Sequence, residues 1–397
     1  MTFSTRLRVL KSNTMTIIDT QWRSYRLPLR SSFTTAHDVL AAREGTIVEI
    51  ITDEGITGIG EIAPIPAFGN STLVQAVAPL PAMATQLQSL QLNEALDCIS
   101  AAIKADAIPA ATACGLEIAL LDALGKLDGC TVGELLLRSS DSMPLPSLDH
   151  ALPRSAIAVN AIIGAATVET AITAVRQAVA AGFGCVKLKV GRDTGEAIER
   201  VAAVREAIGP AVHLRLDANE AWSIEQAREI LNGCAGYDIQ YVEQPLRADD
   251  LAGMYKLRQE VSVSIAVDEA LHNLASVRQA LSLEAADIFI IKPQLVGGLR
   301  TSRQIIREAA DRGVQCVVTS SIESGIGLVA ALHLAAASPE ITLECGLATL
   351  HLLADDLLAD DLPIHHGSLA VPTAPGLGVR LDRSALERYT LPTGGHV

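Results

Sequence analysis

Two kinds of hydrophobic periodicity follow one another in the first third of the chain. Residues 46–52 and 57–61 alternate apolar and polar side chains around an Asp-Glu-Gly turn, which predicts a β-hairpin. Residues 71–138 instead repeat apolar side chains at helical spacing, most strongly over 110–127. Strands followed by helices predict an α+β domain, which we place at residues 15–145.

A strict alternation of short apolar runs and amphipathic helices begins after the prolines at 144, 146 and 153. Eight runs start 24 to 28 residues apart, which predicts a barrel of strands and helices over residues 146–355. The expected strands lie near residues 157–163, 185–190, 212–217, 239–244, 263–268, 287–292, 314–319 and 341–346. An open, doubly wound sheet is the competing architecture, but residues 160–164 lack the glycine-rich turn that its first strand would need.

Both ends of the chain are expected to lie outside this barrel. Residues 356–397 contain short strand-like runs at 367–372 and 379–381, and we expect this tail to return to the N-terminal sheet. Residues 1–14 carry basic side chains without the apolar stretch of a secretory signal, and we expect a disordered extension there. No apolar run reaches the roughly 20 residues that a membrane span needs.

Composition narrows the range of partners. The 397 residues are 49% hydrophobic with a net charge of −14 and only 3% aromatic, which favours a well-buried α/β protein and argues against a nucleic-acid partner. The seven cysteines show neither disulfide nor zinc spacing, so we expect a reducing cytoplasm rather than a membrane or secreted location. A homo-oligomer remains open.

Charged residues end five consecutive apolar runs inside the expected barrel. In chain order they are Lys187 with Lys189, Asp217, Glu243, Asp268 and Lys292. Neighbouring parallel strands lie about 4.8 Å apart, so the three carboxylates should converge at the carboxyl ends of the strands and need a compensating cation. Ligation by oxygen alone favours Mg²⁺, with Mn²⁺ as a substitute. Taken singly, each carboxylate could equally be a loop cap or a surface ion-pair partner.

The lysines suggest an acid–base role. Lys187 and Lys189 lie two residues apart on one strand, so both side chains face the barrel interior. Their mutual repulsion and burial can lower a lysine pKa from about 10.4 toward the value of a general base. Lys292 is four strands away and should face Lys189 across the site. This arrangement predicts abstraction of the proton α to a metal-bound substrate carboxylate, through an enediolate that is reprotonated or expels a leaving group.

Other functions for the same pattern stay open. Lys292 could be the Schiff-base lysine of an aldolase-like barrel, which would work without a metal, or the scaffold could only bind ligands. Glu323 lies past the seventh strand and could face the substrate pocket or cap a helix. Ser32 and Phe33 are expected in a loop that could close over the barrel mouth. His37, His365 and His366 are expected on the surface or in the tail.

As a set, these motifs resemble the enolase superfamily, muconate-lactonizing-enzyme subgroup. The motifs are Lys-x-Lys at 187–189, Asp-x-Asn at Asp217 and Asn219, Glu-Gln-Pro at 243–245, Asp-Glu at 268–269 and Lys-x-Pro-like Lys292-Pro293. The resemblance implies an α/β fold: a modified (β/α)7β TIM-type barrel capped by an α+β domain that the N-terminal region and the C-terminal tail build. It also implies Mg²⁺ ligation by Asp217, Glu243 and Asp268, acid–base catalysis by Lys189, and support of the substrate carboxylate by Lys187.

Further segments resemble o-succinylbenzoate synthases. They are Arg43-Glu44-Gly45, Gly60–Pro66 with Phe68-Gly69, Gly297-Gly298-Leu299, the stretch 320–327 that contains Ser320, and Cys345–Thr349. These enzymes dehydrate 2-succinyl-6-hydroxy-2,4-cyclohexadiene-1-carboxylate in menaquinone or phylloquinone synthesis. The resemblance therefore implies a syn elimination in which Lys189 removes the proton and protonates the departing hydroxide, with Lys292 as a cation over the ring.

Epimerisation is the main rival reaction, because Lys189 and Lys292 could supply one base on each face of the α-carbon. Dipeptide epimerases of this subgroup hold the substrate ammonium with Asp-x-Asp on the last strand, where this chain has Glu344-Cys345-Gly346. N-succinylamino acid racemase and muconate cycloisomerase activities also remain open, since a shared fold does not settle the substrate.

Overall fold

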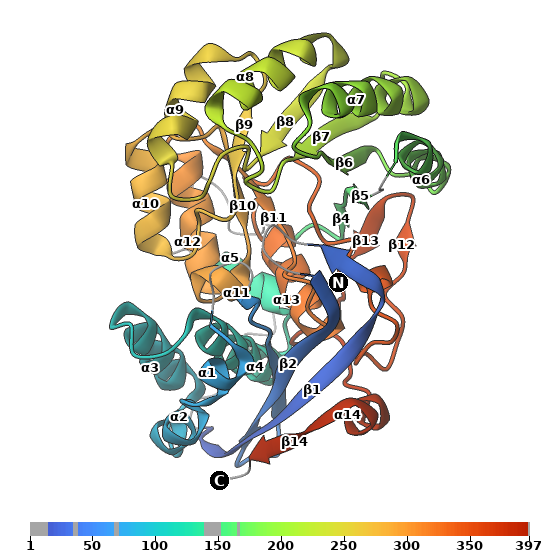
Figure 1. Ribbon diagram of the computed structural model, residues 1–397. Coiled ribbons are helices and arrows are strands. Elements are labelled where there is room, and N and C mark those ends of the chain that lie inside the picture. Colours follow the sequence, from blue (N-terminus) through green and yellow to red (C-terminus); the bar gives the residue numbers. More distant parts are fainter. Residues whose placement is uncertain (1–14, 35–38, 67–70, 139–151, 165–166, 396–397) are drawn as a thin grey trace, which may run out of the picture.

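The computed structural model describes residues 15–34, 39–66, 71–138, 152–164 and 167–395. An antiparallel sheet with its own helices packs against a barrel of parallel strands that is surrounded by further helices (Figure 1). The predicted fold class is therefore confirmed. The expected disordered extension at 1–14 lies outside the described residues, and the proposed domain boundaries stay predictions. No helix within the described ranges combines the length and apolar character needed to cross a membrane.

The N-terminal sheet forms from the two strands of the predicted hairpin, the strand that precedes them and one strand of the tail. It has the order β14-β1-β2-β3, with β1 at Ile17–Thr34, β2 at Val39–Thr52, β3 at Thr57–Ile62 and β14 at Thr390–Gly395. All of its pairs are antiparallel. Since β14 lies beside β1, the predicted return of the tail to this sheet is confirmed.

Five helices follow the sheet, as the periodicity predicts. They are α1 (Leu73–Val77), α2 (Leu80–Leu87), α3 (Leu92–Lys104), α4 (Ala110–Asp128) and α5 (Val132–Arg138). Most of α4 is buried on every side, and it packs tightly on β3: a Cβ atom at Gly60 would lie 2.1 Å from the Gly115 carbonyl oxygen. Glycine at both positions therefore permits the close approach of strand and helix. Gly129 ends α4 in the left-handed conformation.

Seven parallel strands form the wall of the barrel, in the sheet order β11-β10-β9-β8-β7-β6-β5. Their bounds are β5 Ala161–Ile163, β6 Cys185–Lys189, β7 His213–Asp217, β8 Ile239–Glu243, β9 Ile265–Val267, β10 Ile288–Ile291 and β11 Gln315–Val318. The helices outside them are α6 Val168–Ala180, α7 Thr194–Ile208, α8 Ile224–Gly233, α9 Leu251–Glu260, α10 Leu274–Ser282, α11 Pro293–Val296, α12 Leu299–Ala310 and α13 Gly325–Ala336. Each strand falls within a predicted run.

The predicted eighth strand at 341–346 is wrong in detail. Only isolated parallel bridges form there, between Val159 and Cys345 and between Thr319 and Gly346. The Cys345 amide donates to the Ala158 carbonyl at 2.8 Å, and the Gly346 amide donates to the Val318 carbonyl at 2.9 Å. The barrel therefore closes through a few hydrogen bonds. Glycine at position 346 permits the close approach of Thr319, because a Cβ there would lie only 2.2 Å from the Thr319 hydroxyl.

Two further strand predictions need correction. The run 157–163 splits, and its first half becomes β4 (Ala156–Ala158), which joins β13 (Ser368–Ala370) and β12 (Ile364–His365) in a small separate sheet. The predicted strand at 379–381 does not form, apart from a bridge between Leu381 and Leu358. The tail also contributes α14 (Arg383–Tyr389) before β14.

The expected loop at Ser32 and Phe33 is wrong, because β1 continues through both residues. Phe33 pairs with Leu40 across the long β1–β2 hairpin. Leu29 forms a bridge with Leu353, just after the short helix η3 (Leu350–Leu352) that follows the last barrel segment. The hairpin thus reaches the barrel as a paired ribbon, and its far end lies beside the barrel in Figure 1.

Candidate active site

The strand register sets the charged residues of the barrel in two levels. Lys189, Asp217 and Glu243 are direct neighbours on β6, β7 and β8. Two residues earlier on the same strands, Lys187, Arg215 and Tyr241 form the level below. Because residues two apart on a strand face the same side, all six side chains project into the barrel interior.

The predicted lysines and carboxylates do meet. Lys187 Nζ lies 2.6 Å from Glu243 Oε1 and 3.0 Å from Asp217 Oδ2. On the other side, Lys292 Nζ lies 2.6 Å and 2.5 Å from the two oxygens of Asp268. The three carboxylates and Lys292 are buried, so these ion pairs lie away from bulk water.

Burial and crowding of like charges perturb this group strongly. Burial, together with Asp217 and Asp268, raises the pKa of Glu243 to about 8 against the opposing charge of Lys187. Burial alone would lower the pKa of Lys187, but Asp217 and Glu243 outweigh it and raise that pKa well above 10.5. The pKa of Lys292 is raised in the same way by Asp268 and Glu269, again against the effect of burial. Lys187 and Lys292 are therefore held as cations.

Lys189 behaves oppositely to the other two lysines. Burial lowers the pKa of Lys189 from 10.5, and the neighbouring charge of Lys187 lowers it further, whereas Asp217 opposes both effects. A lysine with a lowered pKa is more often neutral and can accept a proton. Of the three lysines, Lys189 is thus the one prepared to act as a base.

The three carboxylates at the strand ends form a set of donors that fits a hard divalent cation. Asp217, Glu243 and Asp268 offer only carboxylate oxygens, and a cation would favour the ionised form of Glu243, whose pKa burial and the charges of Asp217 and Asp268 raise. Within the described residues, no three Asp, Glu, His or Cys side chains are already arranged to hold a metal. The ammonium groups of Lys187 and Lys292 lie against these carboxylates instead. The three carboxylates are therefore candidate ligands whose present counter-ions are lysines.

Glu269 is a further buried acid that the motif contains but the sequence does not single out. Asn219 Nδ2 donates to Glu269 Oε1 at 3.3 Å, which joins the ends of β7 and β9. Burial and then the charge of Asp268 raise the pKa of Glu269 well above 4.5. The predicted substrate residue Asn219 thus lies at the edge of the cluster of carboxylates, and its backbone amide donates to Asp217 Oδ1 at 3.1 Å.

Ser320 and Glu323 lie together in the loop after β11. Ser320 Oγ donates to Glu323 Oε2 at 2.5 Å, and Thr349 Oγ1 donates to Ser320 Oγ at 2.9 Å. The Ser321 amide also donates to Glu323 at 2.8 Å. Glu323 therefore folds back on its own loop, and helix α13 takes a different cap. The side chain of Phe33 lies outside the described part of the chain.

Ser324 is the N-cap of α13, and the start of this helix is also bound by Glu61, which comes from β3 of the N-terminal sheet. Its carboxylate accepts hydrogen bonds from the amides of Ser324 and Gly327, both at 2.8 Å, and from the hydroxyls of Ser324 and Tyr25. A carboxylate at a helix N-terminus is favoured by the unpaired amides there. Burial raises the pKa of Glu61. The capping domain is thereby joined to the barrel directly beneath the Ser320 loop.

Arg43 fixes the same loop from the capping domain. Its guanidinium donates to the Ile322, Pro64 and Ala63 carbonyls, each at 3.1 Å. Ile322 has a φ of 58°, which is strained for a β-branched residue. Sequence alone marks Arg43 and Glu61 only as parts of motifs, because their partners in the loop before α13 are more than 250 residues away.

A second ion pair, between the buried Arg215 and the partly buried Glu344, lies in the lower level of the barrel. Arg215 Nη2 lies 2.8 Å from Glu344 Oε2, and Arg215 also donates to the Glu344 carbonyl and to Gln240. Its guanidinium lies 4.9 Å from the centre of the Tyr241 ring. Arg215 shares the strand face of Asp217, and this parity could have revealed it in the sequence. Glu344 is consequently paired with Arg215, below the level of Lys189, Asp217 and Glu243.

Comparison with known proteins agrees with this geometry. Residues 170–385 match the family model "Enolase C-terminal domain-like", and residues 19–121 match "MenC, N-terminal domain". An o-succinylbenzoate synthase from Thermobifida fusca is 38% identical over 224 residues, which cover 55% of this chain and 67% of that protein. A hydrophobic dipeptide epimerase from Enterococcus faecalis is 29% identical over 327 residues, which cover 81% of this chain and 87% of that protein.

The fold comparison extends over almost the whole chain. A crystal structure of N-succinyl Arg/Lys racemase from Bacillus cereus superposes with a TM-score of 0.86 at 24% identity, covering 96% of this chain and all of that one. The match spans both the capping domain and the barrel. On these matches, together with the lysines and carboxylates at the strand ends, the chain is an enzyme of the enolase superfamily, in the muconate-lactonizing-enzyme subgroup, and it resembles o-succinylbenzoate synthases.

Proposed function

We propose that this enzyme removes the proton α to a substrate carboxylate, and that its reaction is dehydration of 2-succinyl-6-hydroxy-2,4-cyclohexadiene-1-carboxylate to o-succinylbenzoate in menaquinone or phylloquinone synthesis. The observation that carries the proposal is the contrast among the lysines. Lys189 has a lowered pKa, whereas carboxylates hold Lys187 and Lys292 as cations. One base between two cations suits an elimination that needs one base.

The roles of the side chains follow from their places. Asp217, Glu243 and Asp268 would hold Mg²⁺, or Mn²⁺ as a substitute, which when bound would draw charge from the substrate carboxylate and acidify its α-proton. Lys189 accepts that proton and returns it to the departing hydroxide. Lys187 binds the substrate carboxylate, and Lys292 offers its positive charge to the other face of the ring. Asn219, Ser320, Glu323 and Phe33 would complete the substrate pocket.

Dipeptide epimerisation is less well supported by the last barrel segment. A dipeptide substrate brings an ammonium group that needs a carboxylate near the upper level of the barrel. Glu344 is paired with Arg215 in the lower level, and Gly346 and Ala348, which follow it at strand spacing, carry no charge. Binding an ammonium through Glu344 would thus require breaking its ion pair with the buried Arg215, which costs about 3 kcal/mol, the lower end for buried pairs, because Glu344 is partly exposed.

Racemisation of N-succinylamino acids is the second candidate. N-acylation removes the ammonium charge, so the engagement of Glu344 does not disfavour these substrates. A relative named N-succinyl-L-Arg/Lys racemase from the same Bacillus cereus strain is 27% identical over 92% of this chain, and it supports this alternative. The two reactions differ in the number of bases, since racemisation requires Lys292 to exchange a proton as well as Lys189.

A direct assay separates these reactions. Purified enzyme with Mg²⁺ is supplied with the cyclohexadiene substrate, and o-succinylbenzoate is followed by its absorbance. In parallel, N-succinylamino acids and Ala-Glu dipeptides are incubated in D₂O, and exchange of the α-proton is followed by NMR. We expect dehydration to dominate; absence of dehydration together with fast exchange into either panel would refute the proposal.

Two matched lysine variants test the base. Lys189→Ala should lower kcat by about 10³-fold or more, in the upper range for loss of a general base. Lys256→Ala, on the exposed face of α9, should leave turnover unchanged. Substantial turnover by the first variant would contradict the role of Lys189.

We further propose a cytoplasmic location, which is supported by seven cysteines that are all free thiols.

A further inference from the structure

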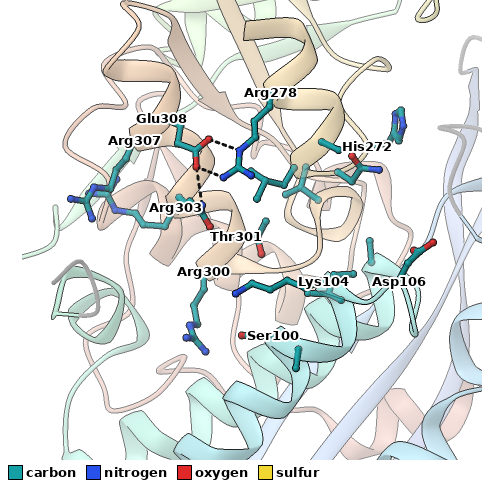
Figure 2. A pocket seen from close by; sticks show the side chains of 18 of the residues that line it. Ser100, Lys104, Asp106, His272, Arg278, Arg300, Thr301, Arg303, Arg307 and Glu308 are labelled. Atoms are coloured by element: carbon teal, nitrogen blue, oxygen red, sulfur yellow. Dashed lines mark hydrogen bonds and ion pairs between the residues drawn. The ribbon is translucent and has the colours of Figure 1, made fainter. Parts of the chain in front are cut away.

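A cavity of about 1530 Å³ lies between the capping domain and the outer face of the barrel (Figure 2). Helix α3 of the capping domain lines one side, and helices α10 and α12 line the other. Among the described residues that surround it, none is a strand-end lysine or carboxylate of the active site. The cavity is therefore a separate space at the junction of the two domains.

Basic residues outnumber acidic ones by five to four in the lining of this cavity, although the chain as a whole has a net charge of −14. The basic lining residues are Lys104, Arg278, Arg300, Arg303 and Arg307, and the acidic ones are Asp97, Asp106, Glu308 and Asp311. Arg278 and Glu308 neutralise one another through two hydrogen bonds of 3.0 Å and 2.8 Å. What matters for ligand binding is how strongly the other cations are paired.

Two of these cations, Lys104 and Arg300, are poorly paired, and Arg303 keeps one unpaired nitrogen beside its ion pair with Glu340. Arg300 has its nearest carboxylate oxygens at 3.9 Å and 4.0 Å, the outer limit for an ion pair. Lys104 makes no ion pair within the described part of the chain. Arg303 is 95% buried, and its Nε has no hydrogen-bond partner there, although Nη1 bonds Glu340 at 2.8 Å. A buried donor without an acceptor is unfavourable, and an anion that accepts a hydrogen bond from it would remove that penalty.

We propose that this cavity binds a small molecule that carries a phosphate group, with Lys104 on one side and Arg300 and Arg303 on the other. Figure 2 shows the Lys104 side chain extending from α3 toward Arg300 on α12. A phosphate offers several acceptor oxygens around one centre, so it can accept hydrogen bonds from lysine and arginine on opposite walls at once. The volume exceeds that of phosphate and leaves room for an organic remainder.

The cavity shares two chain segments with the active site. Its lining residue Val296 lies in α11, four positions after Lys292, and its lining residue His272 lies four positions after Asp268. A ligand that bridges α3 and α12 therefore fixes the capping domain against the segments that follow two charged residues of the site. Because such a ligand binds only the folded chain, its binding stabilises the contact between the capping domain and the barrel.

Inorganic phosphate is the probe that tests this site. Titration calorimetry of the Mg²⁺-loaded full chain, at constant ionic strength, should show one saturable site per chain. Lys104→Gln, at an exposed position, and Arg300→Gln should each raise Kd for phosphate at least about tenfold. Arg312→Gln is the matched control, because it is exposed near the end of α12 and does not line the cavity. Equal binding by all four proteins would overturn the proposal.

Two further arms identify where and what the site binds. Lys189→Ala should keep wild-type affinity for phosphate; loss of binding in that variant, with retention in Lys104→Gln, would place phosphate in the barrel and refute the cavity. Malonate is the carboxylate probe. If malonate binds with the same sensitivity to Lys104 and Arg300 while phosphate does not bind, the phosphate assignment is wrong.

Discussion

Replacement of Glu117 by glutamine should change the pH dependence of stability. Glu117 lies on α4, buried against the start of α12, where its Oε1 accepts a hydrogen bond from the Arg300 amide at 3.2 Å. Its Oε2 has no hydrogen-bond partner within the described residues, and a Cβ at Gly298 would lie 1.7 Å from it. Burial raises the pKa of Glu117 from 4.5 to about 7, although the charge of Arg300 opposes the rise. The amide of glutamine can keep the Arg300 hydrogen bond without this charge.

The size of the effect follows from proton linkage. The folded protein holds the Glu117 proton more tightly than the unfolded chain, so stability falls as the pH rises from the unfolded pKa through the folded one. A pKa shift from 4.5 to about 7 is worth about 3 kcal/mol at full ionisation, at about 1.4 kcal/mol per unit. Between about pH 5.5 and pH 8, the loss specific to Glu117 is about 2 kcal/mol, and Glu117→Gln should escape it.

Urea denaturation followed by circular dichroism measures this difference. The free energy of unfolding of Glu117→Gln relative to wild type should become about 2 kcal/mol more favourable between about pH 5.5 and pH 8. Glu54→Gln, an exposed glutamate in the β2–β3 turn, serves as the matched control and should give no such change. A constant difference between Glu117→Gln and wild type at both pH values would refute the reasoning.

Three further predictions concern the barrel. Removal of metal by EDTA should abolish turnover and Mg²⁺ should restore it; full activity without metal, with a borohydride-trapped adduct on Lys292, would indicate a Schiff-base enzyme instead. Because burial and Lys187 lower the pKa of Lys189, kcat/KM should rise with pH to a plateau with an apparent pKa below 10.5, and a midpoint above 10.5 would contradict Lys189 as the base. Glu344→Gln removes the partly buried counter-ion of the buried Arg215 and should lower the free energy of unfolding by about 3 kcal/mol in urea; an unchanged midpoint would show that this ion pair does not stabilise the barrel.

Local pattern was sufficient to predict the strands and the charges at their ends. The hairpin, seven of the barrel strands and the positions of Lys189, Asp217 and Glu243 depend on the period of two along a strand and on the regular spacing of the strands. The period is encoded within a few residues, and the spacing of the strands can be read directly from the sequence. The eighth strand failed as a prediction because Gly346 closes the barrel through single bridges, which leave no periodic signature.

Contacts between distant segments decided the chemistry of those residues. The strand period alone does not distinguish Lys187 from Lys189, yet in the folded chain the carboxylates of Asp217 and Glu243 hold the Lys187 ammonium, while the pKa of Lys189 is lowered. Likewise, the sequence does not show that Glu344 pairs with Arg215. Electrostatic interactions depend on distances of a few ångströms in a medium of low polarity, and no one-dimensional pattern contains those distances. The sequence therefore predicted which residues meet, and the folded chain determined which of them is charged.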